Sequence, residues 1–115
     1  MLHSQLIAPR RCSMFGSVFR MLVKPGAKQQ VMRLMDDEMK LRTIPGFHAA
    51  YVFDTGGDEL WGVAVFQNEK AYRDNASDPV QEEWYRKLRS LLQADPEWHD
   101  GSIQAWHPED VIVKV

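Results

Sequence analysis

The feature that constrains this chain most is the order in which two hydrophobic periodicities follow one another. Residues 15–23 alternate apolar side chains with a period of two, which predicts a strand, and residues 27–42 place them at helical spacing. Two further alternating segments, 47–53 and 59–67, are separated by the turn-forming residues 54–58. The first half of the chain therefore predicts a strand, a helix and a hairpin.

The second half predicts a helical connection and one more strand. Asn68 is a typical N-cap for a short helix over 69–75, and Asp78 followed by Pro79 begins a longer helix. An alternating segment over 100–107 then predicts the fourth strand. The order β-α-β-β-α-β predicts an α+β, ferredoxin-like fold, with a four-stranded antiparallel sheet and two helices on one face.

Composition and charge narrow the class of protein. A chain of 115 residues predicts one domain, and a net charge of −2 argues against nucleic-acid binding, which needs a basic face. No apolar run approaches the roughly 20 residues of a membrane span. Cys12 is the single cysteine, so no internal disulfide forms, and we expect a cytoplasmic protein. We divide the chain into an arm (1–13), a domain (14–107) and a tail or edge strand (108–115).

The predicted sheet is apolar on both faces. Two helices cover only one face, and a monomer rarely exposes a contiguous apolar sheet. We therefore expect a homodimer with its two sheets packed face to face. The predicted interface residues are Val18, Leu22, Trp61, Val63 and Trp106.

The helix-facing side of the third strand carries the small residues Gly62 and Ala64, which leave room above it. Aromatic side chains from several elements can surround that room, and flat rings suit a flat hydrophobic or aromatic ligand. Ordinary core packing is the competing interpretation. The predicted pocket residues are Phe19, Gly62, Phe66, Tyr72, Trp84 and Tyr85, with Trp98 as a further aromatic neighbour.

Several turn and packing motifs resemble those of a known family. They include Val23-Lys24-Pro25-Gly26, Ile44-Pro45-Gly46-Phe47, Asn75-Ala76-Ser77-Asp78-Pro79 and the segment 95–101. From Met14 to about Trp106 the chain resembles the antibiotic biosynthesis monooxygenase (ABM)-like group of the dimeric α/β-barrel superfamily. The resemblance implies a pocket between sheet and helices in each subunit. Members include cofactor-independent monooxygenases, haem-degrading enzymes and proteins of no known activity.

The haem-degrading branch is disfavoured residue by residue. Its asparagine, tryptophan and ligating histidine fall here on Phe19, Phe66 and Trp84, and tryptophan supplies no axial nitrogen to iron. The sequence also shows no CxxC and no histidine pair at i, i+4 spacing. We therefore expect neither a cofactor nor a metal.

Oxygenation without a cofactor needs a group that takes a proton from a phenol or enol, and histidine is the natural one. His48 ranks first because its strand lies near the middle of the fold, ahead of His99 and His107. The first hypothesis is a cofactor-independent monooxygenase acting on a small aromatic or quinol-type substrate. The alternatives are a non-catalytic small-molecule-binding or stress-responsive barrel, and a dimer whose core is filled and has no pocket.

Overall fold

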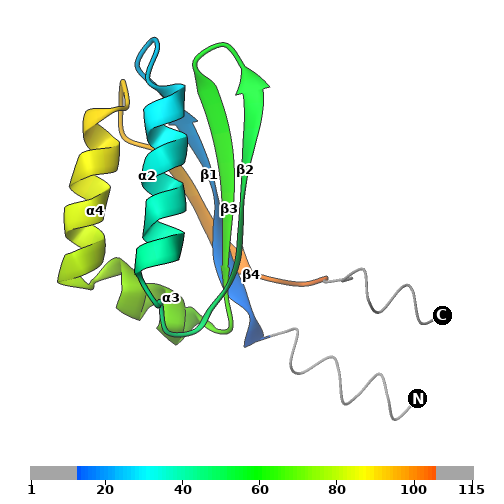
Figure 1. Cartoon of the computed structure of the whole chain (residues 1–115). Coiled ribbons are helices and arrows are strands. Elements are labelled where there is room, and N and C mark those ends of the chain that lie inside the picture. Colours follow the sequence, from blue (N-terminus) through cyan, green and yellow to red (C-terminus); the bar gives the residue numbers. More distant parts are fainter. Residues whose placement is uncertain (1–12, 106–115) are drawn as a thin grey trace, which may run out of the picture.

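The architecture is a four-stranded antiparallel sheet with helices packed on it (Figure 1). The computed structural model describes residues 13–105. The elements are β1 (Phe15–Leu22), α2 (Lys28–Leu41), β2 (Phe47–Gly56), β3 (Glu59–Phe66), α3 (Glu69–Ala76), α4 (Pro79–Ser90) and β4 (Glu97–Ser102). The strand order β2-β3-β1-β4 places β1 and β3 in the centre, so the predicted α+β, ferredoxin-like fold is confirmed. No helix within 13–105 has the length and apolar content needed to cross a membrane.

The two N-caps that the sequence predicted are present at the starts of α3 and α4. The Asn68 side chain accepts a hydrogen bond from the Ala71 backbone N–H at 2.8 Å, which caps α3. The Asp78 carboxylate accepts from the Val80 N–H at 2.9 Å, and Pro79 occupies the first turn of α4. Each cap satisfies a donor that the helix itself leaves unpaired, so the two helices begin at fixed residues.

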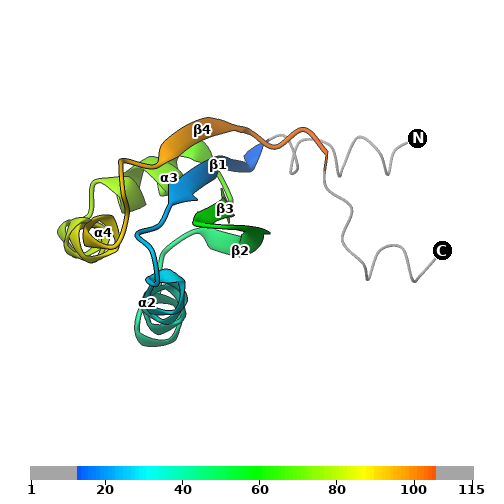
Figure 2. The same cartoon turned by 90° about the horizontal axis from the view of Figure 1, so that it is seen from above.

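The two long helices, α2 and α4, lie on the same side of the sheet (Figure 2). Phe19 and Met21 of β1 and Leu60 of β3 point toward the helices and are buried. They pack with residues of α2, of α4 and of the segments beside them, which form the solid core of the domain. These partners are Val23, Ala27, Val31, Leu88 and Leu92.

A bulge in β2 corrects the predicted alternation of that strand. The sequence places Phe47 and Ala49 on one face, but the register shifts between them, which makes His48 the extra residue. Phe47 lies opposite Phe66, and the two rings meet edge to face at 5.7 Å. Ala49, in contrast, pairs with Val65 on the outer side of the sheet.

The fourth strand begins and ends earlier than predicted. β4 covers Glu97–Ser102 and pairs with β1 from Arg20 opposite Glu97 to Phe15 opposite Ser102. Residues 103–105 are not in a strand, and 106–107 lie outside the described residues. All six side chains of β4 are exposed because it is an edge strand, so no apolar alternation marks it.

The outer face of the sheet carries apolar side chains that no described residue covers. Val18 is 43% exposed, Tyr51 63% and Phe53 54%. Leu22, Trp61 and Val63 are half-buried on the same face, where Val18 pairs with Val63. Trp106, the fifth predicted interface residue, lies outside the described residues.

The close approach of β1 to β3 requires glycine at position 16. A Cβ on Gly16 would lie 2.1 Å from the backbone oxygen of Ala64, which cannot move without distorting the sheet.

We predict that Gly16→Ala lowers the free energy of unfolding by about 1–3 kcal/mol or more, measured by urea denaturation. Gly101→Ala is the matched control, since a Cβ there meets nothing within 4 Å. Equal stabilities of the two variants would contradict this account of the strand contact.

Candidate functional site

A cavity of about 780 Å³ lies between the sheet and helices α2 and α4. Its floor is formed by the helix-facing sides of β1, β2 and β3, and its walls by α2, α3, α4 and the edge strand β4. The space exists because the floor carries the small residues Ala50 and Ala64, which pair across β2 and β3. The opposite wall is formed by Met32, Met35 and Met39 of α2. Methionine side chains are flexible and can adapt to ligands of different outline.

The structure gathers the predicted pocket residues at this cavity. The five aromatic members of the predicted set line it, namely Phe19, Phe66, Tyr72, Trp84 and Tyr85. Gly62, the sixth member, lies beneath the Phe19 ring. The space directly above Gly62 is therefore filled, but the space beside it remains open.

One part of the cavity wall is polar. The Tyr72 hydroxyl donates a hydrogen bond to Asp100 Oδ1 at 2.9 Å, which joins α3 to β4. Arg73 Nη1 donates to the other carboxylate oxygen of Asp100 at 3.2 Å. The Arg73 guanidinium also lies 5.4 Å from the ring centroids of Phe15 and Tyr72, a distance at which cation–π attraction acts. These contacts fix a phenol, a carboxylate and a guanidinium next to an otherwise apolar space.

The environment shifts the pKa values of the two acidic groups in opposite directions. Burial, followed by the hydrogen bond to Asp100, raises the pKa of Tyr72. Burial also raises the pKa of Asp100, but Ser17, Tyr72 and Arg73 together lower it more, so the net shift is downward. The buried Ser17 hydroxyl lies opposite Asp100 and makes no hydrogen bond of ordinary geometry, yet it lowers both pKa values. At neutral pH, Tyr72 is therefore protonated and Asp100 is charged.

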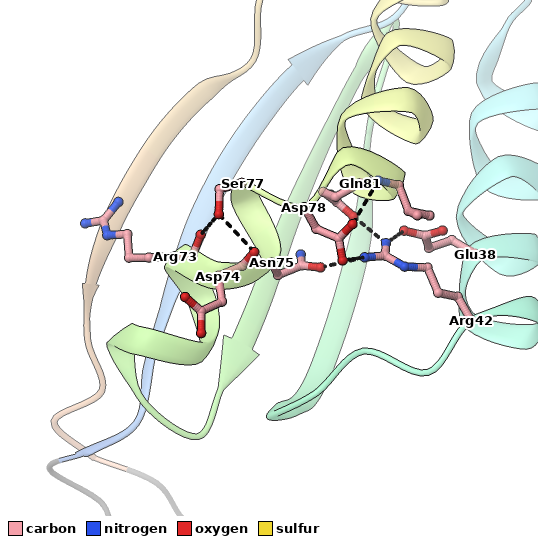
Figure 3. A network of polar contacts seen from close by, with 9 residues as sticks. Glu38, Arg42, Arg73, Asp74, Asn75, Ser77, Asp78 and Gln81 are labelled. Atoms are coloured by element: carbon pink, nitrogen blue, oxygen red, sulfur yellow. Dashed lines mark hydrogen bonds and ion pairs between the residues drawn. The ribbon is translucent and has the colours of Figure 1, made fainter.

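A clasp centred on Arg42 holds α2 against the junction of α3 and α4 (Figure 3). Arg42 Nη1 donates to Glu38 at 2.5 Å and to Gln81 at 2.8 Å, and Nη2 donates to Asn75 at 3.0 Å. A longer contact of 3.4 Å reaches Asp78, the cap of α4. Three of these partners, Glu38, Asn75 and Gln81, line the cavity. The clasp therefore closes the gap between the two helices at one side of the cavity.

Trp84 is a second connection between the long helices. Its indole Nε1 donates to the Leu34 backbone oxygen of α2 at 3.2 Å, while its ring lines the cavity. A buried indole needs such an acceptor, so the ring is held in one orientation. The clasp and Trp84 therefore connect α2 to α3 and α4 beside the cavity, where the sheet residues below the helices are small.

The structure does not bring the histidines to this cavity. His48 is exposed on the β2 bulge, and it is not among the described residues that line the cavity. His99 pairs with Val18 on the outer face, with its Nε2 3.5 Å from Glu97 Oε1. His107 lies outside the described residues. The role of His48 as proton acceptor stays a prediction.

Sequence reasoning identified Tyr72 but missed the charged and amide members of the site. Arg73 and Asp100 are 27 residues apart along the chain, and Arg42 and Gln81 are 39 apart, so no local pattern connects either pair. Two weak sequence signals pointed to these polar residues. Arg73 follows the predicted pocket residue Tyr72 on a short helix, and Arg42 comes just before Ile44-Pro45-Gly46 at the end of a helix. Over residues 13–105 no group of three or more His, Cys, Asp or Glu side chains is arranged to hold a metal ion.

The sequence matches one protein family, and the fold matches several solved structures. The model of the family described as antibiotic biosynthesis monooxygenase matches residues 14–87. No curated protein matches the sequence significantly. Among solved structures, a monooxygenase from the gene ActVA-Orf6 of Streptomyces coelicolor, in complex with the ligand Nanaomycin D, is 26% identical. It superposes with a TM-score of 0.72, covering 91% of this chain and 99% of that one.

Two further solved structures have the same fold. SnoaB, a cofactor-independent oxygenase from Streptomyces nogalater, is 19% identical with a TM-score of 0.72, over 84% of this chain and 99% of its own. NE2512, a protein of unknown function from Nitrosomonas europaea, is 14% identical with a TM-score of 0.71, over 85% of this chain and 96% of its own. The fold thus occurs both in oxygenases and in proteins of unknown function.

The Tyr72–Asp100 contact predicts an alkaline titration that can be seen directly. In the difference between the tyrosinate absorbance of the wild type and that of Tyr72→Phe, Tyr72 should ionise above the ordinary pKa of tyrosine. Asp100→Asn should move this titration downward, because the negative charge that opposes ionisation is gone, while burial still holds it above the ordinary value. An unchanged titration in Asp100→Asn would contradict the proposed coupling.

The Arg42 clasp predicts an asymmetry between two arginines. Arg42→Ala leaves Glu38, whose side chain is only 9% exposed, without its charged partner. We expect the free energy of unfolding to fall by about 1–3 kcal/mol. Arg86→Ala is the control, because Arg86 pairs with Glu82 and Glu83 on an exposed helix face, and its loss should cost no more than about 0.5 kcal/mol. Urea denaturation of both variants checks this, and similar losses would show that the clasp is not structural.

Proposed function

This chain belongs to the antibiotic biosynthesis monooxygenase family, and we propose that it oxidises a flat aromatic phenol or quinol with dioxygen, without a bound cofactor. The observation that carries the proposal is the cavity of about 780 Å³, apolar on most sides, with Tyr72, Arg73 and Asp100 together in its wall. An apolar space with a few convergent polar groups is the usual form of a small-molecule site.

The shape and lining of the cavity support a planar aromatic ligand. Phe19, Phe66 and Trp84 offer ring surfaces, and rings attract one another in offset or edge-to-face contact. The structurally similar Streptomyces coelicolor monooxygenase holds Nanaomycin D, which supports a small-molecule ligand for this chain as well. The methionines of α2 adapt to the outline of such a ligand, so the polar groups are left to fix its orientation.

The reaction needs no external reductant when the substrate supplies the electrons. In an anthrone, a ring CH₂ becomes C=O: one oxygen atom of O₂ becomes the carbonyl oxygen, and the other leaves as water with both hydrogens. The substrate first loses a proton to solvent, because no described residue that lines the cavity is a base with a pKa near neutral, and the resulting electron-rich anion forms a C–O bond to dioxygen. The resulting peroxide takes up a proton, and its O–O bond breaks as the second C–H bond is lost and the carbonyl forms.

The polar groups can serve distinct steps of this sequence. The Arg73 guanidinium, held by Asp100, stabilises the negative charge of the substrate anion. Tyr72 donates a hydrogen bond to Asp100 and retains lone pairs that can accept a hydrogen bond from a substrate hydroxyl. Tyr72 is protonated at neutral pH, and its O–H can turn from Asp100 to the peroxide anion, which is basic enough to take the proton. Asp100, with its lowered pKa, is a weak base and orients Tyr72 instead.

The second candidate function is binding without catalysis. It is favoured by one observation, which is that no histidine lies among the described residues that line the cavity. A pocket without a base near neutral pKa can hold a hydrophobic metabolite and leave it unchanged. Turnover separates the two candidates.

We also propose that the outer sheet face joins a second copy of this chain. Val18, Leu22, Trp61 and Val63 lie on that face, and Tyr51 and Phe53 are exposed there. The ion pairs of Arg20 with Glu59 and Glu97 lie within this face, where Arg20 pairs with Trp61. Burying such a face against an identical one removes apolar surface from water on both sides.

Oxygen consumption with a panel of hydroquinones and anthrones tests the enzymatic proposal. We expect turnover by the wild type and a fall in kcat/KM of about a hundredfold in Tyr72→Phe, which removes the proton donor. Tyr85→Phe removes the same atom elsewhere in the cavity wall and should cost far less. A flat oxygen trace across the panel would leave binding as the function. Loss of turnover in His48→Ala, with Tyr72→Phe active, would instead support the base predicted from sequence.

Light scattering tests the dimer. The wild type should have twice the mass of one chain at micromolar concentration, and Val18→Asp should shift it toward the monomer, because a carboxylate would be buried in the interface. Val80→Asp is the control, since Val80 is 58% exposed on α4, away from the sheet face. A wild-type protein with the mass of one chain would rule out the dimer.

A further inference from the structure

The Phe19 ring lies directly on Gly62, its partner across β1 and β3. A Cβ built on Gly62 would be 2.3 Å from Phe19 Cζ and 2.5 Å from Cε2, so the ring occupies the place where a side chain would begin. On its other side the ring meets Trp98 of β4, with the centroids 4.8 Å apart. The ring is thus held between a glycine and an indole.

This position is the boundary between the solid and the hollow part of the domain. Phe19 belongs to the core cluster with Met21 and Leu60, and it also lines the cavity. Toward Met21 the sheet residues are large and fully buried, whereas toward Ala64 they are small and leave space. Only the Phe19 ring separates the two regions along β1.

We infer that Phe19, seated on Gly62, is the end wall of the cavity and sets the length of the ring system that the protein accepts. The inference rests on the proposed function only in that the cavity binds aromatic molecules. Lengthening the cavity requires a smaller residue at position 19. Shortening it requires a side chain at position 62 that lifts the ring.

Gly62 makes room for the Phe19 ring because it has no side chain, and not because of its backbone conformation. The glycines with positive φ in the described chain are Gly26, Gly46, Gly56 and Gly57, and Gly62 is not among them. Alanine at position 62 therefore meets no strain from a positive φ, and the three atoms nearest to its Cβ all belong to the Phe19 ring. Trp98, which also lines the cavity, limits movement of the ring toward β4, so we expect the ring to turn toward the helices and into the cavity.

Two substitutions should consequently move ligand selectivity in opposite directions. Phe19→Leu keeps an apolar residue but removes the far end of the ring, so the cavity extends toward Met21. Gly62→Ala pushes the ring into the cavity and shortens it. In the double variant Phe19→Leu/Gly62→Ala, the shorter side chain leaves room for the new Cβ, so the effect of the alanine should be reduced.

Calorimetric titration with phenol, 2-naphthol and 2-hydroxyanthraquinone tests this, because none of the three needs to be turned over. We expect Phe19→Leu to strengthen binding of the three-ring ligand relative to 2-naphthol by about tenfold, and Gly62→Ala to weaken it by a similar factor. Met39→Ala at the exposed wall of the cavity is the control, and it should change both affinities together. Circular dichroism establishes that each variant is folded.

The inference would be overturned if Phe19→Leu and Gly62→Ala changed the affinities for 2-naphthol and 2-hydroxyanthraquinone by equal factors. A wild type that binds none of the three ligands would also overturn it. A crystal structure of Gly62→Ala gives a readout without ligand: the Phe19 ring should be turned into the cavity, and an unmoved ring would contradict the end-wall role. Changed selectivity without oxygen consumption would leave this inference standing and remove the monooxygenase. Oxygen consumption with unchanged selectivity would do the reverse.

Discussion

The difference in side-chain size along the helix-facing side of the central strands decides where this domain is solid and where it is hollow. Met21 and Leu60 meet the helices at one end and are buried completely or nearly so. Ala64 and Ala50 occupy the corresponding places further along β3 and β2, where side chains this small cannot reach the helices. Straight helices over such a surface touch it at one end only, so a cavity follows from the sequence of the strands.

A hollow of this size would be unstable if nothing held the helices over it. Close-packed interiors normally collapse around missing volume, and an unsupported void forfeits dispersion contacts. Beside the cavity, directional contacts connect the helices in addition to the side-chain packing of the core. Arg42 engages acceptors on α2, α3 and α4, and Trp84 reaches the backbone of α2. The polar groups that keep the cavity open are thus part of its wall, which links stability to the capacity for binding.

The sequence predicts those parts of the structure that depend on local patterns. The faces of β1 and β3, the caps at Asn68 and Asp78, and the ferredoxin-like order all arise from neighbouring residues and from the covering of one sheet face. The bulge at His48 breaks the alternation of β2 without a local signal, and it moves the following residues to the opposite face. β4 has no apolar alternation because it is an edge strand of polar residues, so its bounds were misplaced. The Tyr72–Asp100 contact joins elements that come together only when the sheet has formed, and no spacing announces it.

The molecule thus has a sheet whose inner side is hollow at one end, polar groups beside that hollow, and an apolar outer side that we propose joins a second copy. The central claim is that the hollow holds a flat aromatic molecule with an oxygen directed at Tyr72. A crystal structure of the wild type grown with 2-hydroxyanthraquinone tests it most directly. The account predicts ring density between the sheet and helices α2 and α4, with the ligand hydroxyl at hydrogen-bond distance from Tyr72 Oη. Ligand bound only to the outer face, above an empty or collapsed cavity, would contradict it.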